Sequence, residues 1–174
     1  MSLQLVEIAP AATDAASVRS SIDQVATAAS SVGGELIEAQ VSAQGGRAFI
    51  IVEHDDAVVL QKALASAGIA TEAVDPVRLV GAELADVKAA RTSPGQYLVE
   101  WDLPEGLTME TYLARKKEKS PLYAQVPEAK FLRTYVREDL VKCLCFYDGD
   151  DEDAVRKARE VVSAPVDRFH RLER

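Results

Sequence analysis

The second half of the chain shows the clearest alternation of polar and hydrophobic positions. Residues 96–101 alternate as a β-strand does, and Pro104 and Gly106 stop the strand. Thr108 is placed to cap a helix, because hydrophobic residues recur after it at helical spacing. The whole pattern predicts strands over residues 96–101, 130–137, 142–147 and 168–173, and helices over residues 108–124 and 150–162. The predicted order is therefore β-α-β-β-α-β.

The first half gives the same order when its pattern is interpreted independently. Gly33 and Gly34 close one amphipathic helix, and Asp56 caps a second one. The pattern predicts strands over residues 3–9, 35–43, 47–53 and 71–80, and helices over residues 18–32 and 56–68. Short echoes, such as residues 5–8 against residues 98–101, support an internal duplication.

This order is typical of the ferredoxin-like fold, in which a four-stranded antiparallel sheet carries both helices on one face. We therefore predict an α+β protein with two ferredoxin-like units, residues 1–91 and residues 92–174, joined at a Thr-Ser-Pro-Gly linker. Each unit alone leaves one sheet face open to water. We expect the two open faces to pack against each other as a pseudo-dimer, like a dimeric α/β barrel. Pairing of two whole chains as a homodimer stays open.

Composition places the chain among ordinary globular proteins. It has 174 residues, 48% of them hydrophobic, and a net charge of −8, most of which belongs to residues 1–91. Such acidity argues against binding to nucleic acid or to an anionic membrane surface, because both need a dense basic surface. The sequence also shows no apolar run long enough to span a membrane and no signal peptide, so we expect a cytoplasmic protein.

Cysteine and histidine are too sparse for the usual metal centres. Cys143 and Cys145 stand two positions apart on one predicted strand, about 7 Å from each other, which is too far for an unstrained disulfide. A zinc site needs a second pair of Cys or His, and His54 and His170 lie far apart in the sequence. We interpret the two cysteines as small hydrophobic residues, with a redox or soft-metal role as the alternative. The residues alone predict no cofactor.

Strand alternation predicts a candidate ligand site on the open face of the second sheet. Its members are Glu100, Arg133, Tyr135, Cys145 and Tyr147, with Phe131 and Cys143 beside them. The same alternation turns the following residues toward the helices: Val99, Trp101, Leu132, Val136, Leu144 and Phe146. A partly buried Glu100 beside Arg133 is the kind of charged pair found at functional sites. The alternative is a purely structural Glu100–Arg133 pair with aromatic packing.

Three other sequence features give weaker evidence for a functional site. Residues 148–153 are acidic but lack the glycine and glutamate that a calcium loop requires, so we assign them to a helix N-terminus. The basic run over residues 115–119 could hold a phosphate or an acidic partner, or form a solvated helix face. His54 could act as a general base if a substrate bound nearby, or be an ordinary surface histidine. The sequence contains no nucleophile elbow, phosphate-binding glycine-rich loop or dinucleotide fingerprint.

Four short motifs resemble a family of small bacterial ferredoxin-like domains. They lie at residues 97–104, 134–139, 142–147 and 153–155. The resemblance covers residues 96–174, and the family is mainly of unknown function but includes a dimeric nickel-binding member. The resemblance therefore implies the ferredoxin-like fold, a tendency to pair, and nickel as a ligand.

Three functions follow as hypotheses. The first is a noncatalytic binding module that holds a small ligand or a metal ion between the paired sheets. The second is a cofactor-independent enzyme that uses Glu100, Arg133 and Tyr135 for proton transfer. The third is a noncatalytic protein-interaction subunit.

Overall fold

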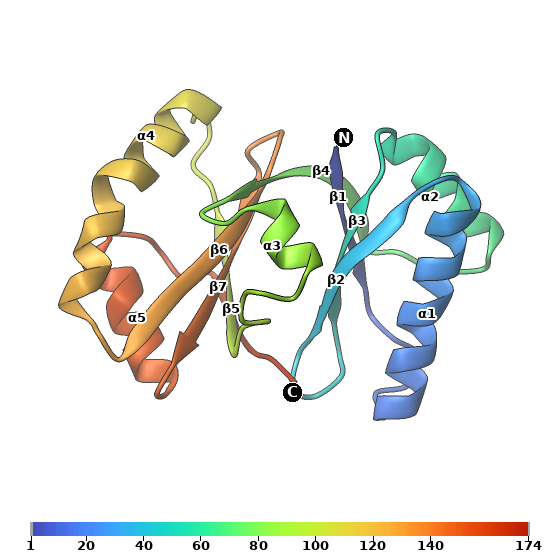
Figure 1. Cartoon of the computed structure of the whole chain (residues 1–174), viewed down its shortest axis with the longest axis horizontal. Helices are drawn as coiled ribbons and strands as arrows, with labels where there is room; N and C mark the ends of the chain where they lie inside the picture. The colour runs from blue at the N-terminus through green and yellow to red at the C-terminus, as the bar shows by residue number, and fades with distance from the viewer. Residues whose placement is uncertain (1, 174) are drawn as a thin grey trace.

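The computed structural model describes residues 2–173, which form the order β-α-β-β-α-β twice (Figure 1). The first repeat contains β1 (Leu3–Ile8), α1 (Ala15–Ser31), β2 (Glu35–Val41), β3 (Ala48–Glu53), α2 (Ala57–Ser66) and β4 (Ala73–Val80). The second repeat contains β5 (Tyr97–Asp102), α4 (Met109–Lys119), β6 (Ala129–Arg137), β7 (Lys142–Gly149), α5 (Glu152–Val161) and β8 (Arg168–Arg171). The predicted tandem α+β fold is thereby confirmed.

Two helical details differ from the prediction. A short helix, α3 (Leu84–Lys88), stands between the repeats, where its Val87 is buried and Leu84 packs on the barrel interior. The helix predicted over residues 108–124 is divided into α4 and a 3₁₀ helix, η1 (Ser120–Gln125). Pro121 explains the division, because its missing N–H cannot continue the α-helical hydrogen bonds. The caps predicted at Asp56 and Thr108 are confirmed, since the side chain of each accepts backbone N–H bonds at a helix start. Asp151, within the acidic run assigned to a helix N-terminus, caps α5 in the same way.

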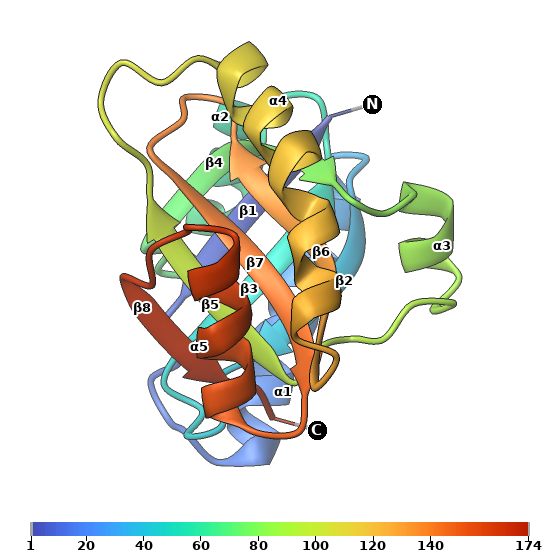
Figure 2. The same cartoon turned by 90° about the vertical axis from the view of Figure 1, so that its left-hand side faces the viewer.

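The strands form one antiparallel sheet in the order β2-β3-β1-β4-β6-β7-β5-β8. β4 and β6 join the two repeats in the middle of this order. At the ends, the Ala43 N–H donates to the Arg171 carbonyl at 2.7 Å, and the Glu173 N–H donates to the Val41 carbonyl at 2.7 Å. The outer strands therefore meet, and the eight-stranded sheet closes into a barrel. α1 and α2 cover one side of it, and α4 and α5 cover the other (Figures 1 and 2).

The predicted contact between the open sheet faces is the filled interior of this barrel. Its buried residues come from both repeats: Leu3, Leu5, Phe49, Ile51, Val77, Leu98, Tyr135, Leu144, Phe146 and Leu172. A separate core lies between the sheet and each pair of helices. None of the helices within residues 2–173 is both long and apolar enough to cross a membrane.

The side chains of β7 point opposite to the sequence prediction. Cys143, Cys145 and Tyr147 face α4 and α5, whereas Leu144 and Phe146 face the barrel interior. The register of the sheet explains the error, because directly paired residues share a face. Cys145 is paired with Val99 of β5, which faces the helices as predicted.

The prediction also failed at the start of β6. A register shift between Phe131 and Arg133 interrupts the alternation of that strand. Phe131 consequently packs on the helix side, while Leu132 packs against the barrel interior. Both placements are the reverse of those predicted.

Candidate functional site

The predicted ligand site does not assemble, because Arg133 pairs with a residue of the first repeat. Arg133 donates to both carboxylate oxygens of Glu38, from Nε at 2.9 Å and from a terminal nitrogen at 2.5 Å. Tyr135 also donates to Glu38, and Arg133 further donates to the Ser93 carbonyl at 2.8 Å. The predicted Glu100–Arg133 pair is wrong. A buried carboxylate–guanidinium pair does exist here, but its acid is Glu38 on β2.

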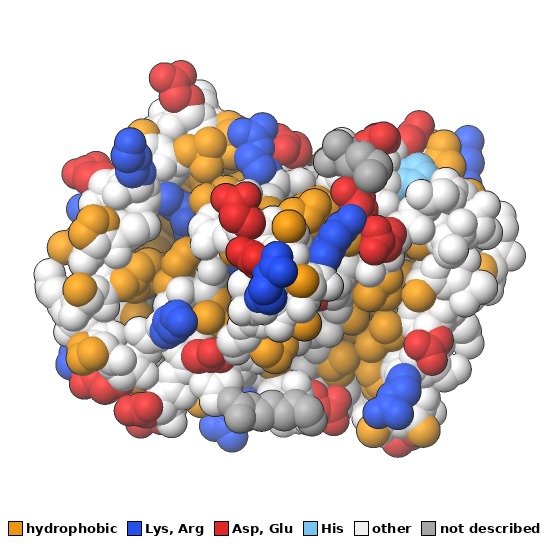
Figure 3. Space-filling view, viewed as in Figure 1, with side chains coloured by type: hydrophobic (Ala, Val, Ile, Leu, Met, Phe, Trp, Pro, Cys, Tyr) orange, Lys and Arg blue, Asp and Glu red, His pale blue; other side chains and the backbone are white. Residues whose placement is uncertain are grey.

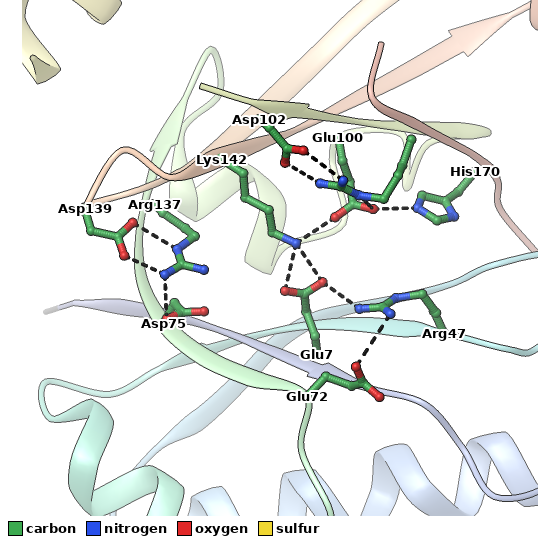
Figure 4. A network of polar contacts seen from close by, with 11 residues as sticks. Glu7, Arg47, Glu72, Asp75, Glu100, Asp102, Arg137, Asp139, Lys142 and His170 are labelled. Carbon is green, nitrogen blue, oxygen red and sulfur yellow. Dashed lines mark hydrogen bonds and ion pairs between the residues drawn. The ribbon is translucent and has the colours of Figure 1, made fainter. Parts of the chain in front are cut away.

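Glu100 lies in a different network inside the barrel (Figure 4). Its carboxylate accepts hydrogen bonds from Lys142 at 2.7 Å and Arg168 at 2.9 Å, and lies 2.7 Å from Nε2 of His170. Burial raises the pKa of Glu100, but the hydrogen bonds with His170 and Lys142 outweigh it and hold the pKa at about 2. Glu100 is therefore ionised and fully paired at neutral pH. It is separated from the Arg133–Tyr135 pair with which the enzyme hypothesis combined it.

A small hollow lies on the helix side of the second repeat, beneath α4, η1 and α5. It measures about 30 Å³. Figure 2 shows α4 and α5 standing in front of β5 and β7. The residues that matter most in the lining of the hollow are Trp101, Tyr112, Arg115, Lys116, Tyr123 and Arg159. Three of these belong to α4, where spacings of three and four residues place them on one helix face.

Arg159 gives this hollow an unusual electrostatic character. Its side chain is almost completely buried, with 2% of the residue exposed. One terminal nitrogen donates to the Tyr147 hydroxyl at 3.1 Å and the other donates to the Pro165 carbonyl at 2.8 Å, but Nε has no partner. Within residues 2–173, no carboxylate forms an ion pair with Arg159. A buried guanidinium without a counter-charge is costly, so this position favours an anion.

Two further groups beside Arg159 add to this preference. Lys116 donates to the Thr134 hydroxyl at 2.9 Å and, in the part of the chain that the structure describes, pairs with no carboxylate. The Tyr112 hydroxyl is completely buried beside the Cys143 thiol, and it forms no hydrogen bond with a nitrogen or oxygen atom of the described residues. The hollow therefore places the Arg159 guanidinium and the Lys116 ammonium, neither of them paired with a carboxylate, beside the Tyr112 hydroxyl.

Two other hollows of the described residues contain no buried cation without a carboxylate partner. A groove of about 890 Å³ separates α3 from α4, and Figure 3 shows acidic and basic side chains gathered around α3 at its edge. Its arginines are already paired, Arg78 with Glu138 at 3.0 Å and Arg91 with Asp86 at 2.8 Å. A hollow of about 350 Å³ at the end of the barrel contains Arg47 and His170, which are paired with Glu7 and Glu100.

Two of the five predicted site residues, Cys145 and Tyr147, lie in the core beneath the α4–α5 hollow. The Tyr147 hydroxyl lies 2.8 Å from that of Tyr123, and Cys145 is buried in the same core. Burial raises the pKa of Tyr123 to about 12, so both phenols stay neutral. Sequence reasoning missed Trp101, Tyr112 and Arg159, because no motif marks them. It did contain one signal, the basic run over residues 115–119, which supplies part of the lining.

One comparison with known proteins finds a match to the second repeat. Residues 97–172 match the family model described as nickel responsive protein SCO4226-like. This SCO4226-like segment agrees with the resemblance noted for residues 96–174, and it contains every side chain that lines the α4–α5 hollow. A search of curated proteins finds no match to the chain.

Solved structures support the fold of the whole chain. A candidate monooxygenase from Lactobacillus acidophilus NCFM is 10% identical, with a TM-score of 0.51, and the match covers 99% of this chain and 92% of the other. A candidate chlorite dismutase, TA0507, is 11% identical, with a TM-score of 0.53, and the match covers 100% of this chain and 96% of the other. At such low identity these likenesses concern the fold alone.

The donor groups of the SCO4226-like segment do not fit a nickel centre. Within residues 2–173, no three or more His, Cys, Asp or Glu side chains are grouped so that they could hold a metal ion. In the SCO4226-like segment the one imidazole, His170, is engaged with Glu100 through Nε2.

His54 of the first repeat accepts the Asp56 N–H through Nδ1, and its Nε2 lies 3.1 Å from the Val32 carbonyl. The predicted general base is thus held by the backbone.

Proposed function

We propose that this protein is a noncatalytic binding module that holds a small anion in the α4–α5 hollow. The observation that carries the proposal is the buried, unpaired Nε of Arg159 beside the buried hydroxyl of Tyr112. Side chains fill the barrel interior, so we place the ligand on the helix side of the sheet rather than between the sheets. In the proposed division into units 1–91 and 92–174, the second unit supplies the whole site.

Size and donor chemistry restrict the ligand class. The hollow is small, about 30 Å³, so we restrict the ligand to a carboxylate group or a small inorganic oxyanion. Two guanidinium groups lie over the Trp101 ring, that of Arg115 at 5.3 Å and that of Arg159 at 5.6 Å from the ring centre. The aromatic wall therefore stabilises the cations, and the cations in turn hold the anion.

Thermal shift with acetate, sulfate and phosphate at constant ionic strength tests this proposal. A specific ligand adds RT ln(1 + [L]/Kd) to stability, which is about 2.7 kcal/mol at a hundredfold excess over Kd. We expect a saturable rise in melting temperature with at least one anion, and its loss in Arg159→Gln. Arg156→Gln is the matched control, because Arg156 lies on the same helix but pairs with Glu152 at the surface.

Two results would contradict the proposal. One is the absence of any saturable shift with all three anions. The other is an equal response of the Arg159→Gln variant and the parent protein. Nickel chloride, compared with sodium chloride, serves as an additional arm: because the donor groups do not fit nickel, we expect no shift specific to that ion.

A further inference from the structure

The two cysteines lie closer together than the sequence suggested. Cys143 and Cys145 project from the same face of β7, and their sulfur atoms are 3.8 Å apart. Both residues are completely buried in the core beneath α4 and α5. This pair is not used by the proposed anion site, but it stands directly behind Tyr112, Lys116 and Arg159.

Hydrogen bonds distinguish the two sulfurs. The Thr134 hydroxyl accepts a bond from Lys116 at 2.9 Å and therefore directs its own hydrogen to the Cys145 sulfur, 3.2 Å away. The Cys143 thiol can donate to the same sulfur. The Cys145 sulfur thus accepts two hydrogen bonds. One comes from Thr134, whose hydroxyl is itself bonded to the Lys116 ammonium group. Hydrogen bonds of this kind stabilise a thiolate.

Charge supports the same distinction. The hydrogen bond with Cys143 lowers the pKa of Cys145 well below the ordinary thiol value, and the positive charges of Lys116 and Arg159 lower it further, against the opposing effect of burial. That hydrogen bond, together with burial, raises the pKa of Cys143. A Cys145 thiolate would also supply the counter-charge that Lys116 and Arg159 lack among the carboxylates of the described chain.

We propose that Cys143 and Cys145 form an oxidisable dithiol in which Cys145 is the attacking thiolate and Cys143 the resolving thiol. With hydrogen peroxide as the oxidant, the Cys145 thiolate attacks one peroxide oxygen, so that an S–O bond forms, the O–O bond breaks and hydroxide leaves. That hydroxide takes the proton of Cys143 and becomes water. The Cys143 thiolate then attacks the Cys145 sulfur, forming the S–S bond and releasing hydroxide. The two sulfurs lose two electrons, and the peroxide gains them.

The resulting disulfide is strained and therefore readily reversed. The sulfurs must approach from 3.8 Å to about 2.05 Å. β7 is held by β5 and β6 on its two sides, so the backbone contributes little to this movement. Strained disulfides are more easily reduced and are commonly the regulatory ones. Oxidation also removes the thiolate charge beside Arg159 and Lys116, which leaves both cations free for an external anion.

Intact mass measurement of the reduced full-length protein after a small excess of hydrogen peroxide tests the dithiol. We expect the parent protein to lose the mass of two hydrogen atoms and to regain it on reduction. In Cys143→Ser, the sulfenic acid has no resolving thiol and is captured at Cys145 by dimedone. In Cys145→Ser, the remaining thiol stays unreacted at the same peroxide dose. Retention of both thiols in the parent, or equal labelling of the two single variants, would overturn the proposal.

A third variant guards against misfolding of the serine variants. Thr134→Val keeps both cysteines and the side-chain volume but removes the hydroxyl donor, so we expect its peroxide reaction to be slower by on the order of tenfold. An unchanged rate would mean that the hydrogen-bond chain does not activate Cys145.

The link to the proposed anion site is measured separately. This link rests on the proposed function. For the anion that raises the melting temperature, we expect the oxidised protein to bind about tenfold more tightly than the reduced protein. If neither form binds an anion but the dithiol still oxidises, the proposed function fails and the dithiol stands. If the reduced protein binds an anion but resists peroxide, the dithiol fails and the proposed function stands.

Discussion

Lys142 of the second repeat forms an ion pair with Glu7 of the first repeat, with 2.9 Å between Nζ and Oε2. The same ammonium group lies 2.7 Å from Oε1 of Glu100 (Figure 4). Glu7 and Glu100 occupy corresponding positions on β1 and β5, so one cation bridges two equivalent acids that the barrel brings together. The Lys142 side chain is 12% exposed and the two glutamates less, which makes this a largely buried junction between the repeats.

Replacement of this cation is expected to destabilise the fold. Lys142→Met should lower the free energy of unfolding by about 3 kcal/mol, because two buried carboxylates lose a shared partner. Lys130→Met is a suitable control, since Lys130 is exposed on neighbouring β6. Urea unfolding of both variants measures the difference. Equal midpoints for the two variants would show that Arg47, Arg168 and His170 already compensate the glutamates without Lys142.

The same network predicts a loss of stability in acid. The pKa of Glu100 is lowered from 4.5 to about 2 in the folded protein. A carboxyl with a depressed folded pKa stabilises the protein above its unfolded pKa, and this contribution disappears as the pH falls toward the folded pKa. We expect Glu100 to contribute about 3 kcal/mol at neutral pH and to lose this contribution between pH 4.5 and about 2.

Glu100→Gln isolates this contribution from those of other acids. The variant should be less stable than the parent at pH 6, and the difference should shrink as the pH falls to 2.5. Denaturant unfolding across this range gives both curves. Parallel curves would mean that Glu100 is not the group whose protonation matters.

The element order could be predicted because it depends on local signals. Helix caps are local signals of this kind: the side chains of Asp56, Thr108 and Asp151 accept hydrogen bonds from residues two or three positions away. Bonds over so short a distance can be predicted from the sequence. Closure of the sheet into a barrel was not predicted in this form, because it depends on contacts between distant segments. The bonds of Ala43 with Arg171 and of Glu173 with Val41 span most of the chain.

The candidate site was harder to predict for the same reason. Sequence alternation placed Arg133 and Tyr135 in the barrel interior correctly, but their partner Glu38 lies on β2, nearly a hundred residues away. The face of Cys145 depends on strand register, which period-two alternation alone does not set. Arg159 was missed because an arginine on an amphipathic helix ordinarily points to water. Here it is buried below Trp101, with a ring-centre distance of 5.6 Å.

The Glu38 cluster gives a prediction about a single hydroxyl. Tyr135→Phe removes a hydrogen bond to a buried carboxylate and should cost about 2 kcal/mol of unfolding free energy. Tyr97→Phe is the matched control, because Tyr97 is also buried in the barrel wall but forms no side-chain hydrogen bond in the described structure. Chemical unfolding of both variants measures the effect. A cost below that of the control would show that Arg133 alone satisfies Glu38.

Closure of the barrel predicts slow hydrogen exchange at the junction between β2 and β8. In an open sheet, the outward amides of both edge strands would exchange with solvent, whereas here the Ala43 and Glu173 amides donate to carbonyls across the junction at 2.7 Å. We expect both amides to be protected by at least tenfold relative to the exposed Gln44 amide in the adjacent turn. Native-state exchange followed by NMR resolves these positions. Exchange of Ala43 and Glu173 at the rate of Gln44 would mean that the junction opens frequently and that β4 and β6 form the one lasting strand pairing between the repeats.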